Sequence, residues 1–117
     1  MSTPRLLPAF VAACALALGA CAKRTRDIEP ALLLRDPFAG AACPALLATR
    51  ARLSQALIFY GLEQDQISAD DRTRTLGVPT PMGTGPEGDN ETKIALLKGE
   101  LVVLEDDVAR TCGPNER

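Results

Sequence analysis

The sequence predicts an all-α protein whose main domain is an antiparallel helical hairpin closed by a disulfide. Two segments carry apolar residues at spacings of three and four, which is the period of an α-helix and not the alternation of a strand. A stretch rich in proline and glycine separates the two segments, and a cysteine stands at the outer end of each. The expected parts of the chain are a signal segment over 1–20, a tether over 21–42, helices over about 43–64 and 90–112 joined by a loop over 65–89, and a tail over 113–117.

The first helix of the hairpin is expected to begin at Cys43. Pro44 takes the first helical position, where its missing N–H removes no hydrogen bond. Gly61 indicates either a weakened last turn or the end of this helix, which we place near residue 64. The apolar positions that set the helical period are Leu46, Leu47, Ala51, Leu53, Leu57, Ile58 and Leu62.

The segment over 65–89 is expected to be a loop. A loop of this length is usually either functional or disordered, and the sequence leaves both possibilities open. Its second half excludes a regular helix, because prolines and glycines interrupt it at Gly77, Pro79, Pro81, Gly83, Gly85, Pro86 and Gly88.

The second helix is expected to begin at Asp89 or Asn90, either of which can cap its free N–H groups, with the acidic Glu91 in its first turn. The glycine and proline that follow Cys112 end it. Gly99 is less favourable than alanine in a helix by about 1 kcal/mol, so it either allows a close helix approach or is tolerated on an exposed face. The apolar positions form a coiled-coil-like seam of Ile94, Leu97, Leu101, Leu104 and Val108.

The two cysteines at the ends of the hairpin, Cys43 and Cys112, are expected to form a disulfide. An exported protein meets an oxidising compartment, and the chain has neither a C-x-x-C motif nor a histidine to support a redox pair or a metal site. Closing a loop of this length stabilises a small domain by about 4 kcal/mol on the chain-entropy model.

This disulfide sets a register in which opposite residues have numbers that sum to about 155. The register brings the basic Arg50 and Arg52 towards the acidic Glu105 and Asp106, a surface pairing worth at most about 1 kcal/mol. The expected helix-pairing seam joins Leu47 to Val108, Ala51 to Leu104, Ser54 to Leu101 and Ile58 to Leu97, and it includes Ile94.

Further apolar positions lie outside this seam and need a cover. The apolar patch Ala31–Leu34 in the tether is one candidate, and a second protein is the other. The residues alone leave both open. The positions concerned are Leu46, Leu53, Leu57, Leu96 and Val103.

The N-terminus has the architecture of a secretory signal peptide. Arg5 precedes an apolar run from Leu6 to Leu18, and Leu18-Gly19-Ala20-Cys21 resembles the lipobox of bacterial lipoproteins. A transmembrane anchor is disfavoured, since the run is shorter than the roughly 20 residues that cross a bilayer. Ordinary cleavage before Lys23 is the other alternative.

The resemblance implies that Cys21 becomes the lipidated N-terminus of the mature protein, anchored almost irreversibly by two or three acyl chains. The basic residues Lys23, Arg24 and Arg26 then either lie against anionic headgroups or form a solvated juxtamembrane segment. In enteric lipoproteins an aspartate after the lipidated cysteine favours retention in the inner membrane. Ala22 stands there in this chain, which implies an outer-membrane protein facing the periplasm.

Composition narrows the functional classes. Without residues 1–20 the chain has 12 basic and 15 acidic residues, a net charge of −3, and it has no basic stripe for nucleic acid. With no histidine, we expect no catalytic residue, no metal site and no cofactor. We expect a small lipid-anchored protein of the bacterial cell envelope that serves as a structural or interaction component and docks on an envelope protein partner. The alternative is a soluble or tethered periplasmic protein that binds a small ligand.

Overall fold

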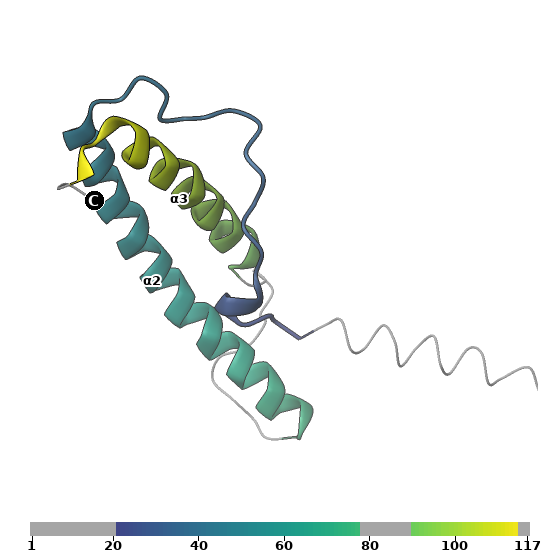
Figure 1. The fold of residues 1–117 in the computed structure, drawn as a ribbon. Coiled ribbons are helices and arrows are strands. Elements are labelled where there is room, and N and C mark those ends of the chain that lie inside the picture. The colour runs from purple at the N-terminus through teal and green to yellow at the C-terminus, as the bar shows by residue number, and fades with distance from the viewer. Residues whose placement is uncertain (1–20, 78–89, 115–117) are drawn as a thin grey trace, which may run out of the picture.

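The protein is described by a computed structural model over residues 21–77 and 90–114. A short 3-10 turn, η1 (Thr25–Asp27), precedes two helices, α2 (Cys43–Thr75) and α3 (Glu91–Thr111). The two helices pack antiparallel (Figure 1). The all-α hairpin is therefore confirmed, whereas the expected signal segment, the end of the tail and the proline-rich half of the loop lie outside the described residues.

The expected disulfide is present between Cys43 and Cys112, whose Cα atoms are 5.2 Å apart. It closes the end of the hairpin at which α2 begins and α3 ends. A buried cluster of Leu46, Leu104, Val108 and Cys112 lies at this end. Phe38, Ala41, Cys43, Leu47, Leu53 and Leu101 pack against this cluster. Two members of that outer layer precede α2, so part of the core cover comes from the N-terminal side of the hairpin.

Helix α3 lies where the sequence predicts it. Asn90 precedes its first residue, as expected of a cap, but its side chain makes no capping hydrogen bond. Instead the backbone N–H of Asn90 donates to Oε1 of Gln64 on α2, at 2.8 Å. At the other end the backbone N–H of Cys112 donates to the carbonyl of Val108. The start of α3 is thus held by a side chain of the facing helix.

Helix α2 is longer than predicted, because it runs to Thr75 where we expected an end near residue 64. Gly61 lies inside the helix, and Gly77 marks its actual end with a positive φ of 83°. The apolar period fades after Leu62, which is why the pattern predicts a loop there. Polar side chains in this extension of α2 contact residues 22–25, and these contacts replace the missing apolar stripe.

The helix-pairing seam is correct on α3 and partly wrong on α2. Ala51 is exposed and Ile58 is 63% exposed, so neither pairs with α3. The inward face of α2 instead follows a seven-residue repeat through Leu46, Leu53, Tyr60 and Ile67, all buried or half-buried. Of the other predicted seam residues, Ile94, Leu104 and Val108 are buried, and Leu47, Ser54, Leu97 and Leu101 are half-buried.

Two polar contacts between the helices fix this arrangement. Arg50 lies 3.5 Å from Glu105, which confirms that part of the predicted register. Arg52 instead contacts Thr49 on its own helix. The ammonium of Lys93 on α3 lies 4.1 Å from the centre of the Tyr60 ring on α2, a cation–π contact. Because Tyr60 faces α3, Ile58, about 200° away around the helix, must face outward.

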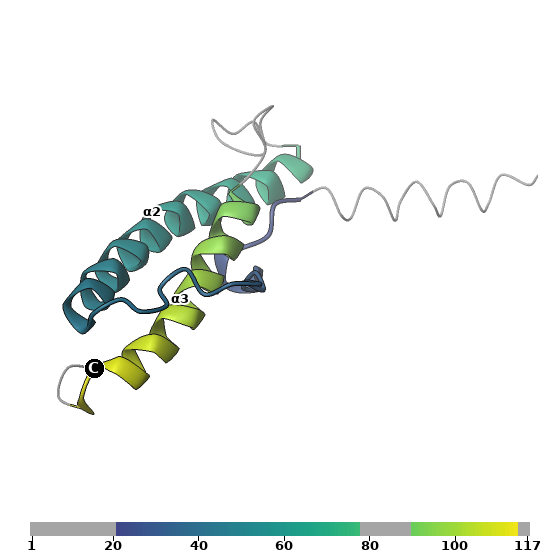
Figure 2. The same cartoon turned by 90° about the horizontal axis from the view of Figure 1, so that it is seen from above.

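The expected tether is not a free linker. Residues 22–31 are bound to both helices, and the chain then continues along α3 to the start of α2 (Figures 1 and 2). In Figure 1, α3 lies between α2 and the outer part of this chain. The apolar patch predicted within the tether covers little of the hairpin, because Leu32 and Leu34 point into solvent while Ala31 and Leu33 are half-buried.

Candidate functional site

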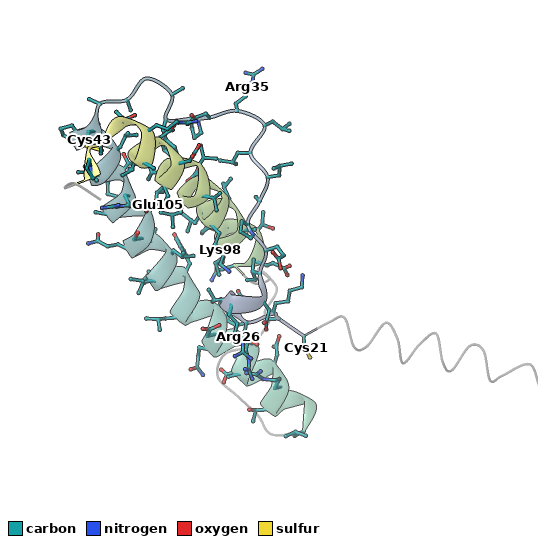
Figure 3. The ribbon with its side chains drawn as sticks, viewed as in Figure 1. Cys21, Arg26, Arg35, Cys43, Lys98 and Glu105 are labelled. Atoms are coloured by element: carbon teal, nitrogen blue, oxygen red, sulfur yellow. A yellow bond between two sulfur atoms is a disulfide. The ribbon has the colours of Figure 1, made fainter. Side chains whose placement is uncertain are left out.

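The candidate site is the junction between Cys21 and the hairpin. Cys21 is exposed, and it lies outside the Cys43–Cys112 disulfide. The next residue, Ala22, is only 8% exposed, so the chain is already packed against the hairpin one residue after the cysteine. We call residues 22–31 the docked segment. Figure 3 shows Cys21 at the edge of the molecule where this segment meets α2.

The docked segment is held on α2 by side chains of the helix extension. The backbone N–H of Ala22 donates to Oδ2 of Asp71 at 3.0 Å. The amide Nε2 of Gln64 donates to the carbonyl of Lys23 at 2.8 Å. Gln64 is fully buried, and its other amide atom accepts from Asn90, so both ends of this amide are satisfied. One buried glutamine therefore joins the docked segment, α2 and the start of α3.

Thr25 makes a second attachment to α2. Its backbone N–H donates to Oδ1 of Asp65 at 2.7 Å, and its hydroxyl donates to the carbonyl of Gly61 at 2.8 Å. An acceptor is needed here because the first N–H groups of η1 have no partner within such a short turn. The side chain of Asp65 supplies one from the neighbouring helix.

Helix α3 binds the same segment from the other side. The ammonium of Lys98 donates to the carbonyls of Thr25 and Ile28, both at 2.6 Å. The backbone N–H of Ala31 donates to the carbonyl of Ala95 at 2.7 Å. Hydrogen bonds that involve a charged donor are about twice as strong as neutral ones. Lys98 therefore makes two charge-assisted links between the docked segment and the hairpin.

Glycine at two positions inside the helices makes room for the docked segment. A Cβ atom added at Gly99 would lie 2.2 Å from the carbonyl oxygen of Ala31, closer than atoms can approach. A Cβ atom at Gly61 would lie 3.2 Å from Cγ2 of Thr25, a tight contact with a side chain. Neither explanation predicted for Gly99 holds as stated, because Gly99 is buried and the group that approaches it is the backbone of the docked segment and not the other helix.

Charge is distributed along the junction in pairs. Lys23 forms an ion pair with Glu91 at the start of α3, at 2.5 Å, and Arg26 lies 3.6 Å from Asp27. Both pairs are largely exposed, so each contributes about 1 kcal/mol at most. At the opposite end of the hairpin, the buried Asp107 accepts a hydrogen bond from Arg110, and this contact raises the pKa of Arg110 above its ordinary value. The guanidinium therefore remains charged at any physiological pH.

Two features are absent from the part of the chain that the structure describes. Over 21–77 and 90–114, no three acidic or cysteine side chains are grouped so that they could hold a metal ion. Within these same ranges, no helix is both long enough and apolar enough to cross a membrane. The chemistry offered at the junction is a cysteine thiol on the surface of the domain, directly joined to a backbone that the hairpin holds in place.

Sequence reasoning identified Cys21 and the disulfide pair but missed the residues that hold the docked segment. Two signals pointed to them. Two glycines interrupt otherwise regular helices, and a glutamine occupies a position where the helical period expects an apolar residue. Each of these glycines and the glutamine would be unfavourable in an isolated hairpin. Each is explained by its contact with the docked segment. The missed residues are Gly61, Gln64, Asp65, Asp71, Ala95, Lys98 and Gly99.

No protein-family model, curated protein or solved structure was found to match this chain. What the protein does is therefore inferred from its own residues and their contacts.

Proposed function

We propose that this protein is a small lipoprotein of the bacterial cell envelope, anchored through acyl chains on Cys21, with the hairpin as a structural or interaction domain. The observation that carries the proposal is the lipobox-like Leu18-Gly19-Ala20-Cys21. Ala22 in place of aspartate favours the outer membrane, facing the periplasm, if the sorting of enteric lipoproteins applies.

Two structural facts support the proposal. The cysteine that would carry the lipid is exposed, and the residue after it is already buried, so cleavage before Cys21 would remove none of the described residues. The disulfide is the kind of bond that forms and persists in an oxidising compartment such as the periplasm.

An interaction role is supported by the outer face of α2. Ile58, Phe59 and Leu62 lie within little more than one turn, and all three side chains are mostly exposed. Large apolar side chains grouped on a surface commonly mark a contact with another molecule. We propose an envelope protein as the partner. A photo-crosslinking residue at Phe59 should give a discrete heavier product in intact cells, and the same residue at the exposed Thr92 should not. No product at Phe59 would contradict this role.

The anchor is tested by the intact mass of protein extracted from native membranes, measured with and without reduction and thiol alkylation. We expect a chain that begins at Cys21 and carries acyl chains, with no alkylation before reduction. An unlipidated mass that begins at Lys23 would overturn the proposal and would leave a soluble periplasmic protein that binds a small ligand as the hypothesis to test.

A further inference from the structure

Two leucines beside the docked segment have no apolar neighbour to cover them. Leu32 is 90% exposed and Leu34 is 94% exposed. Ala31, which precedes them, and Leu33, which lies between them, are half-buried. Half-buried and exposed side chains therefore alternate along residues 31–34. Ala31 fixes the phase, because its N–H is bound to Ala95 and its carbonyl lies against Gly99. The two leucines are thus held outward by the fold.

The position of Cys21 restricts what lies next to this surface. Ala22 is buried and its N–H is bound to Asp71, so no spacer separates the cysteine from the folded domain. A domain anchored through this residue must rest one of its faces on the bilayer. Figure 3 shows Cys21 beside η1 and Arg35, the residue after Leu34, further along the same side of the molecule, where the chain runs outside α3.

We propose that the outward strip formed by Leu32 and Leu34 is a membrane-contact surface that enters the headgroup region of the bilayer holding Cys21. This inference rests on the proposed lipid anchor. It is an interaction with lipid and not with protein, because two leucines flanked by the charged Arg35 and Asp36 form far less surface than the roughly 800 Å² per partner of a stable protein interface. A small contact suffices when a covalent anchor already holds the domain at the membrane.

The contact is expected to be apolar in character. Residues 21–36 contain four basic and three acidic side chains, so their charges nearly cancel. Two of the basic residues are also engaged within the protein, Lys23 with Glu91 and Arg26 with Asp27. The surface should therefore contact neutral phosphatidylcholine vesicles, and added salt should not release it.

The absence of tryptophan from the sequence allows a direct test. Leu34→Trp places a single emitter on the proposed surface, and Phe59→Trp places a matched emitter on α2. Position 59 is about 200° around the helix from Gly61, which contacts the docked segment, so it faces away from that segment. Each variant, as a chain that begins at Cys21 with the Cys43–Cys112 disulfide intact, is coupled through Cys21 to a maleimide lipid in phosphatidylcholine vesicles, with or without brominated acyl chains.

We expect brominated lipid to quench the emission of the Leu34→Trp variant by about half or more, the depth expected of a side chain at the boundary between headgroups and acyl chains. Emission from the Phe59→Trp variant should be unchanged. Adding Leu32→Asp to the Leu34→Trp variant should remove the quenching, because a charge on the same strip resists entry into lipid. Thermal unfolding of each variant in solution, with a midpoint like that of the parent chain, shows that the fold is retained.

The two proposals fail in different ways. An unacylated native mass would overturn the anchor, whatever the vesicle experiment shows. Unquenched emission from the coupled Leu34→Trp variant would overturn the membrane-contact surface and leave the anchor in place. Emission from this variant that shifts to the blue without quenching would mean that protein covers the strip, and this outcome would also overturn the inference.

Discussion

Replacing Gly99 by alanine is expected to destabilise the protein, although alanine is the better helix former. On an exposed helix face the substitution would raise the free energy of unfolding by about 1 kcal/mol. Here the new Cβ atom would meet the carbonyl oxygen of Ala31 at 2.2 Å, and this neighbour is backbone and cannot rotate away. The docked segment must therefore move from α3.

The size of the effect follows from the bonds that this movement breaks. The Ala31–Ala95 backbone bond is worth about 1 kcal/mol, and a bond from the charged Lys98 about 2 kcal/mol. Subtracting the gain of about 1 kcal/mol from helix propensity leaves a net loss of about 2 kcal/mol. Denaturant unfolding followed by circular dichroism measures this difference directly.

Gly61→Ala is the matched control for this prediction. Its Cβ atom would meet only the side chain of Thr25, with the nearest atom at 3.2 Å, and a side chain can shift. We expect its free energy of unfolding to stay within about 1 kcal/mol of the parent value, since the helical gain offsets the tight contact. If Gly99→Ala instead raised stability by about as much as an exposed helix position allows, the docked segment would not lie against α3.

Three further substitutions test the remaining contacts. Cys43→Ser combined with Cys112→Ser should lower the free energy of unfolding by about 4 kcal/mol, and an unchanged melting temperature would contradict the clasp. Lys98→Met keeps the length of the side chain but removes its two hydrogen bonds, and we expect a loss of about 4 kcal/mol in denaturant unfolding, with retained stability showing that these bonds contribute nothing. Leu104→Ala should lower the free energy of unfolding by about 2 kcal/mol or more, because Leu104 is buried. Ile58→Ala should change it by less than about 0.5 kcal/mol, because Ile58 is mostly exposed. Equal effects of the two substitutions in thermal unfolding would refute the corrected seam.

The fold class follows from the sequence because its signals are local. Three features carry the prediction: the proline after Cys43, the apolar period of α3, and a cysteine at the outer end of each helical segment. Each of them acts within one helix or through one covalent bond. These features predicted both helices, their antiparallel arrangement and the disulfide. The bounds of α3 agree with the prediction to within a residue at each end.

The early end predicted for α2 has a physical cause. The pattern of apolar residues assumes that a buried face is apolar, but the second half of α2 is partly covered by backbone. Backbone N–H and carbonyl groups need polar partners, which Gln64 and Asp71 provide. An apolar period therefore loses the helix where polar contacts to a peptide segment sustain it.

The hairpin and the docked segment belong to one cooperative unit, because each provides what the other needs. A hairpin without the segment would carry two glycines that weaken its helices and a buried amide with unmet hydrogen bonds, each unfavourable by about 1 kcal/mol or more. With the segment bound, Gly61 and Gly99 provide the space that it needs and Gln64 satisfies its backbone. The residues that immediately follow Cys21 are therefore part of the fold, and a lipid attached to that cysteine would hold the whole domain, in a fixed orientation, against the membrane.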